Sequence, residues 1–97
     1  MLALDFDAEG RVVIAGRLYA SRADAARSFL DRLEGTVVLD CRRLDYLSSA
    51  GLGALRETHE RLLRSGGRMR LVGVGRHLRD VFAYSGLDQV LDVEPAS

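Results

Sequence analysis

The sequence is poor in the residues that define several specialised classes of protein. It contains one cysteine and two histidines in 97 residues, so the chain holds no internal disulfide and no Cys/His cluster for a structural metal. The one cysteine, Cys41, directly follows an apolar run, and no general base lies near it in the sequence. We therefore expect Cys41 to be a small packing residue rather than a nucleophile.

The chain also lacks an excess of either charge and any long hydrophobic run. Its 14 basic and 14 acidic residues give a formal net charge of zero, which is not the footprint of a nucleic-acid-binding protein. No apolar run approaches the roughly 18 residues of a membrane span. The segment Met1–Asp7 has acids where a signal peptide needs a basic start. These features predict a cytoplasmic protein without membrane insertion or a nucleic-acid partner.

The residues that are present predict one globular domain over residues 1–97. The chain is 47% hydrophobic and 29% charged, and its length suits one core. Periodicity predicts helices that start near residues 21, 48 and 76, and short strands at residues 2–7, 11–16, 36–40, 69–74 and 88–93. This order predicts an α/β fold: a mixed sheet of about four to five strands, with about three to four helices packed mainly on one face.

Two local patterns refine this outline. The run Ser21–Asp24 resembles a capping box and predicts that the first helix starts at Ser21 and continues to Gly35. The apolar run 36–40 predicts a short buried strand that delivers the chain to a loop, residues 44–51, which carries Ser48 and Ser49.

The most informative feature is this pair of serines at the start of the second predicted helix. The first N–H groups of a helix carry partial positive charge, so an anion added there is stabilised. A phosphoryl group on a serine would add about −1.5 to −2 charge. Either Ser48 or Ser49 could equally close the helix as its N-cap. Ala50, Gly51 and Gly53 leave room for an approaching protein, although close helix-to-sheet packing explains one of the glycines equally well.

The sequence offers little for catalysis. Ser49 is the candidate nucleophile, but His59 lies ten residues further along the same predicted helix, roughly 15 Å away, and the G-x-S-x-G elbow is missing. His77 could serve Ser49 only if the next βα loop folded beside it. Gly73-Val74-Gly75 begins like a dinucleotide fingerprint, but its third glycine position is Leu78. We expect no enzymatic activity, no cofactor and no metal.

Three segments together resemble the STAS domain family, in particular the bacterial anti-sigma factor antagonists. They are Gly16-Arg17-Leu18, the run from Val37-Val38-Leu39-Asp40 through Leu44-Asp45-Tyr46-Leu47-Ser48-Ser49-Ala50-Gly51-Leu52-Gly53, and Leu78-Arg79-Asp80-Val81-Phe82-Ala83-Tyr84-Ser85-Gly86-Leu87. The resemblance implies a non-enzymatic switch protein. Its partner would be an anti-sigma factor that is also a serine kinase, and a metal-dependent serine phosphatase would act on the phosphorylated form.

By the same resemblance Ser49 is the phosphorylated residue, and Ser48 is the backup acceptor or helix cap. The unphosphorylated form would bind the kinase and free the sigma factor. The implied partner-binding face comprises Arg17, Tyr19, Ser21, Asp45, Ser48, Ser49, Gly51 and Leu52.

Two departures from the family pattern keep an alternative open. Ser48 and Tyr19 stand where many members carry aspartate. They favour a constitutive, non-phosphorylated STAS subunit, such as the cytoplasmic partner of a lipid-transporting ABC ATPase. The intact Ser49-Ala50-Gly51 and Ser85-Gly86-Leu87 favour the switch.

Overall fold

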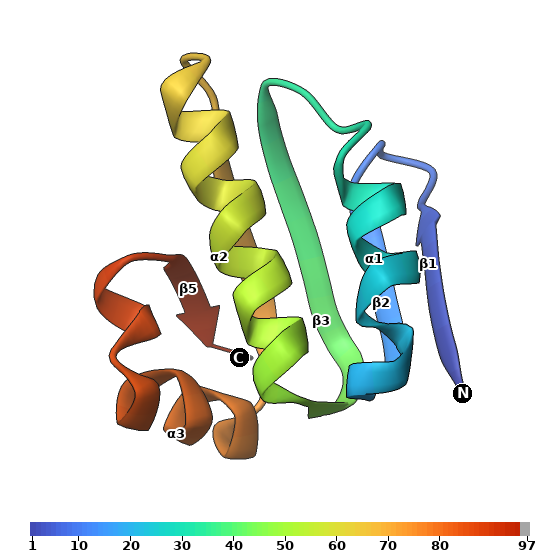
Figure 1. The fold of residues 1–97 in the computed structure, drawn as a ribbon, viewed down its shortest axis with the longest axis vertical. Helices are drawn as coiled ribbons and strands as arrows, with labels where there is room; N and C mark the ends of the chain where they lie inside the picture. The colour runs from blue at the N-terminus through green and yellow to red at the C-terminus, as the bar shows by residue number, and fades with distance from the viewer. Residues whose placement is uncertain (96–97) are drawn as a thin grey trace.

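The protein is built on a five-stranded mixed sheet (Figure 1). The computed structural model describes residues 1–95. The strands lie in the sheet in the order of the sequence, and the first pair is antiparallel while the other pairs are parallel. The strands are β1 (Leu2–Phe6), β2 (Val12–Leu18), β3 (Thr36–Leu47), β4 (Arg68–Val74) and β5 (Asp92–Pro95).

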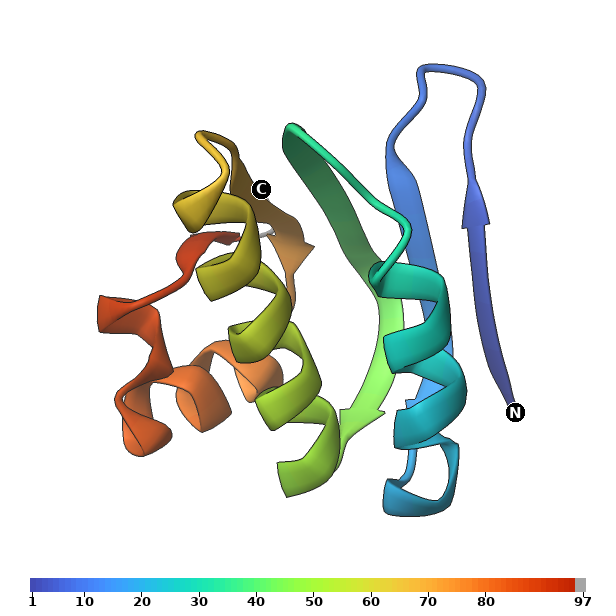
Figure 2. The same ribbon diagram turned by 45° about the horizontal axis from the view of Figure 1, so that its top comes forward.

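The strands β3, β4 and β5 are each reached through a helix. The helices are α1 (Ala23–Leu30), α2 (Ser49–Arg64) and α3 (Arg76–Ser85), with short 3-10 turns η1 (Ala20–Arg22) and η2 (Leu87–Gln89). Figures 1 and 2 show α1 and α2 side by side over one face of the sheet, while α3 runs across the lower end of α2. The opposite face carries no helix from the described part of the chain. The predicted α/β fold is therefore confirmed.

The core fills the space between the central strands and the helices. Ile14, Leu39 and Leu71 lie on three adjacent strands and are fully buried, as are Leu55 on α2 and Phe82 on α3. β3 is the middle strand, so its apolar residues are covered on both sides by neighbouring strands. The sequence predicted a buried strand at residues 36–40, and Val37, Leu39 and Asp40 are buried in that part of β3.

The predicted loop at residues 44–51 is wrong, because β3 continues to Leu47. Its pairing with β4 ends at Asp40, but its pairing with β2 runs on to the pair Leu18 and Leu47. Leu44 and Leu47 are both buried, so the apolar positions that looked irregular in the sequence belong to a strand with register shifts. Only Ser48 separates the strand from α2.

The predicted start of the first helix is also wrong. Residues 20–22 form the turn η1, α1 begins at Ala23, and Arg22 occupies the N-cap position without a side-chain hydrogen bond. Ser21 is exposed and does not cap. α1 ends at Leu30 rather than near Gly35.

The last predicted strand begins later than expected. Gly86 has φ 78° and ends α3 in the left-handed conformation, as the sequence predicted. The chain then makes the turn η2, with the Leu91 N–H donating to the Leu87 carbonyl at 2.7 Å. Residues 88–91 are therefore not extended, and β5 starts at Asp92.

Candidate functional site

The candidate site is the junction between the end of β3 and the start of α2. Ser48 sits there in extended conformation as the N-cap of α2. Its N–H donates to the Leu18 carbonyl at 2.9 Å, and its Oγ accepts from the Gly51 N–H at 3.1 Å. Its carbonyl accepts from the Leu52 N–H at 2.9 Å. Ser48 is only 8% exposed, so its hydroxyl is committed to the helix.

Ser49 has the opposite environment. It is the first residue of α2 and is exposed. The first turn of α2 contains no acidic residue, so no side-chain charge there offsets the positive end of the helix dipole. The two serines, interchangeable as caps in the sequence, are therefore distinct: one closes the helix and the other displays its hydroxyl.

Gly51 lets α2 lie close to the sheet beside this junction. A Cβ at Gly51 would lie 2.8 Å from Leu18 Cγ and 2.8 Å from Leu47 Cδ1, closer than side chains normally pack. At Gly53 the nearest atom to such a Cβ is the Arg27 Nη2, at 3.8 Å. Of the two explanations left open for these glycines, close packing holds for Gly51 and does not hold for Gly53.

An exposed aromatic pair lies at the ends of β2 and β3. Tyr19 and Tyr46 have ring centroids 5.3 Å apart and are 42% and 43% exposed. Arg17, opposite Tyr46 in the strand register, donates from Nη1 to the Tyr19 hydroxyl at 3.1 Å. This hydrogen bond, with the charge of Asp45, raises the pKa of Arg17 above its usual value, so the guanidinium remains charged.

Tyr46 is the residue that sequence reasoning missed. No alternation in the sequence marks it, because buried Leu44 and Leu47 are three residues apart and the register shift against β2 leaves both Asp45 and Tyr46 exposed between them.

The structure gathers most of the predicted partner-binding residues near this junction. The β2–β3 pairing carries Arg17 beside the end of β3, and η1, which includes Ser21, contacts the helix α2. Asp45 is exposed, whereas Leu52 is half-buried and packs against the core. Leu52 and Gly51 therefore contribute to packing beneath the predicted partner-binding face and expose little surface to a partner.

The two serines are expected to differ in their contribution to stability. Ser48→Ala removes the N-cap hydrogen bond and should lower the free energy of unfolding by about 1 kcal/mol. Ser49→Ala, at an exposed position, should change it by less than about 0.5 kcal/mol. Urea denaturation of both variants measures the difference. Equal losses would contradict the assignment of Ser48 as the cap.

The other reactive side chains are committed to structure. His59 is buried, and its Nδ1 accepts from the Met69 N–H at 3.1 Å, which links α2 to β4. Burial raises the pKa of Cys41 to about 12, so its thiol stays protonated and weakly nucleophilic at neutral pH. Within residues 1–95 no group of three or more His, Cys, Asp or Glu side chains is arranged to hold a metal ion.

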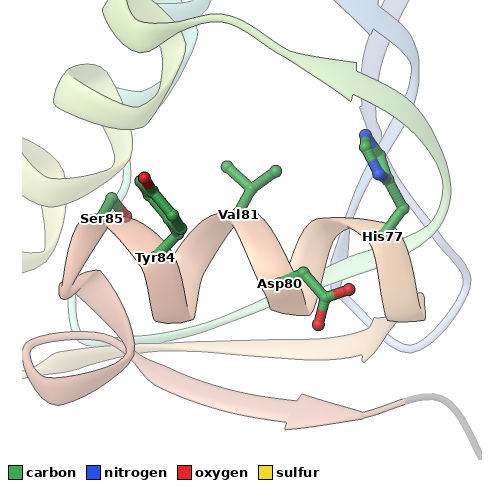
Figure 3. A pocket seen from close by; sticks show the side chains of 5 residues that line it. All are labelled: His77, Asp80, Val81, Tyr84 and Ser85. Carbon is green, nitrogen blue, oxygen red and sulfur yellow. The ribbon is translucent and has the colours of Figure 1, made fainter.

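A shallow pocket lies elsewhere, along α3. It is lined by His77, Asp80, Val81, Tyr84 and Ser85, and Figure 3 shows Val81 and Tyr84 projecting from the same side of the helix. None of the predicted partner-binding residues lines it. The candidate site therefore lies outside this pocket.

No helix among residues 1–95 is both long and apolar enough to cross a membrane.

Comparison with known proteins identifies the family of this chain. Residues 8–97 match the family model described as the STAS domain. A Bordetella bronchiseptica protein named as an anti-sigma factor antagonist, BtrV, is 39% identical over 64 residues, which is 66% of this chain and 55% of the relative. The match thus spans about half the length of that relative.

Solved structures show the same architecture. The Bacillus cell fate determinant SpoIIAA in its phosphorylated form superposes with a TM-score of 0.70 at 23% identity, covering 96% of this chain and 90% of that one. The anti-sigma factor antagonist SpoIIAA in its unphosphorylated form gives a TM-score of 0.74 at 23% identity, covering 96% and 87%. With the family match, this common fold leads to one conclusion: the chain belongs to the STAS domain family.

Proposed function

We propose that this protein is an anti-sigma factor antagonist that acts as a partner-switching protein controlled by phosphorylation of Ser49. One observation carries the proposal: Ser49 is exposed at the start of α2 while the adjacent Ser48 is buried as the cap. A kinase can reach the Ser49 hydroxyl without breaking a hydrogen bond that holds the helix. The implied partner is a serine-kinase anti-sigma factor, and a metal-dependent serine phosphatase reverses the modification.

The relatives support this function. BtrV is named as an anti-sigma factor antagonist, and SpoIIAA has been solved in both its phosphorylated and unphosphorylated forms. We accordingly assign this chain to the cytoplasm, as one STAS domain over residues 1–97 without catalytic activity of its own.

The geometry suggests how a phosphate would act. At the first position of α2 the phosphate's negative charge is favoured by the helix N-terminus, which limits its cost to the fold. The same charge and bulk would stand on the exposed surface at the start of α2. A partner packed against that surface would then meet a desolvated anion, so the phosphate would weaken the complex while leaving the domain folded.

The proposal predicts opposite effects of two substitutions at one position. Ser49→Asp should weaken binding to the host's kinase-type anti-sigma factor by at least about tenfold, or about 1.4 kcal/mol, because it places a fixed negative charge in the interface. Ser49→Ala should bind within about twofold of the wild type, because it retains the small neutral surface. Isothermal titration calorimetry with the purified partner measures both affinities.

The matched control is Ser28→Asp, which adds the same charge at an exposed serine on α1. It should leave the affinity unchanged. If Ser49→Asp binds as well as the wild type, phosphorylation control is refuted. Absence of any binding to a kinase-type partner would instead favour the constitutive ABC-transporter subunit.

A further inference from the structure

The sheet has two edges that differ in their protection against pairing with another chain. β5 is short, carries two acidic residues and ends in a proline, which offers no N–H to a further strand. β1 contains neither proline nor a basic residue, and Asp5 is its one charged residue. Figures 1 and 2 show β1 at the outer edge, with no element of the described chain beyond it.

The hydrogen bonds at the two ends of the β1–β2 pair show which residues of β1 bond to β2 through their backbone groups. The Arg17 N–H donates to the Met1 carbonyl at 2.9 Å, and the Asp7 N–H donates to the Arg11 carbonyl at 2.8 Å. The register between these two pairs is regular. Residues of an antiparallel strand bond alternately to one neighbour and to the other, so the odd-numbered residues of this segment bond to β2.

The even-numbered residues therefore direct their N–H and carbonyl groups away from the sheet. These residues are Leu2, Leu4 and Phe6. The Phe6 N–H accordingly donates to the Asp5 Oδ1 at 2.8 Å and not to β2. The Phe6 N–H is thus held by the side chain of Asp5 and must exchange this bond on docking, whereas the other outward groups of β1 form a row of backbone donors and acceptors for another strand.

The side chains of the same three residues form an apolar row. They share the helix-covered face with buried Val12 and Ile14 on β2. Leu2 and Leu4 are only half-buried, and Phe6 is 55% exposed although its ring lies 5.7 Å from that of Phe29 on α1. Apolar surface therefore reaches the open edge, where a second sheet could cover it.

We propose that β1 is a docking edge for a second copy of this chain, with the two β1 strands antiparallel about a two-fold axis at Leu4. In this register Leu4 exchanges hydrogen bonds with Leu4 of the second copy, and Leu2 does so with Phe6 of the second copy. Every outward-facing backbone group is then paired, and the apolar side chains face one another. On the uncovered face, Ala3 lies opposite Asp5 of the second copy.

The other symmetric registers are poorer. A two-fold axis at Asp5 would place two carboxylates directly opposite, which is destabilising. An axis at Ala3 would leave the outward groups of Phe6 without partners. The sequence of β1 is thus self-complementary in one register, and the contact of two short strands is small enough that the dimer should be weak and dependent on concentration.

Charge substitutions at Ala3 test both the dimer and its register. Ala3 is exposed on the uncovered face opposite Ala15, so neither Ala3→Lys nor Ala3→Glu disturbs the core. Each substitution acts twice in a symmetric dimer. Ala3→Lys, which faces Asp5 of the second copy, should tighten dimerisation by about 2- to 30-fold, and Ala3→Glu should weaken it by a similar factor.

Sedimentation equilibrium of the wild type and both variants, from micromolar to millimolar protein, measures these constants at low salt. The double variant Ala3→Glu with Asp5→Lys should restore dimerisation, because it exchanges the two charges. A wild type that stays monomeric at millimolar concentration overturns the proposal. A dimer that is equally stable in both single variants also overturns it, because that dimer would use another surface.

Discussion

Gly51→Ala is expected to destabilise the protein by about 1–3 kcal/mol. The added Cβ would lie 2.8 Å from atoms of both Leu18 and Leu47, so α2 must move away from the sheet or both leucines must leave their rotamers. For a domain of this size each kcal/mol corresponds to about 4–8 °C in Tm. Thermal unfolding followed by circular dichroism measures the loss.

Gly53→Ala is the matched control two residues further along the helix. Its Cβ meets nothing closer than 3.8 Å, so alanine should stabilise the helix by up to about 1 kcal/mol. The two variants should also differ in partner binding, because displacement of Leu18 disturbs the carbonyl that holds the Ser48 N–H. A Gly51→Ala variant as stable as Gly53→Ala would show that α2 does not rest on the sheet at this point.

Phe82→Ala is expected to have a larger effect, a loss of about 3–5 kcal/mol. Phe82 lies on α3, is fully buried and is the largest of the fully buried side chains in the core. Because domains of this kind are stable by only about 5–15 kcal/mol, the variant should lose a large part of its stability. The midpoint of urea unfolding measures the change.

Tyr84→Ala provides the control on the same helix. Its side chain is 97% exposed, so its removal should change stability by no more than about 0.5 kcal/mol. Equal losses from Phe82→Ala and Tyr84→Ala would contradict the position of α3 against the sheet.

The sequence predicted the element types well because hydrophobic periodicity records which face of each element is buried. The α2 helix, the buried strand before it and the stop at Gly86 follow directly from local patterns. The end of β3 could not be predicted in this way. Its extension to Leu47 depends on pairing with β2, a contact between segments far apart in the sequence.

The candidate site was predicted only in part, because some of its features depend on contacts between segments far apart in the sequence. The family resemblance pointed to Ser49 and left Ser48 as the backup acceptor or helix cap, but only the structure shows that Ser48 is the buried N-cap and that Ser49 is exposed. The exposure of Tyr46 could not be predicted from the sequence, because it depends on the register shift of β3 against β2, which leaves two exposed residues between buried Leu44 and Leu47.

The most direct test of the proposed switch is mass spectrometry of the protein from its native host. Trypsin releases Leu44–Arg56, which contains both serines of the junction, and fragment ions between them assign a phosphate to one or the other. We expect phosphate on Ser49, removed by a serine phosphatase. Phosphate on Ser48, or an unmodified peptide after incubation with the kinase-type partner and ATP, would contradict control through Ser49.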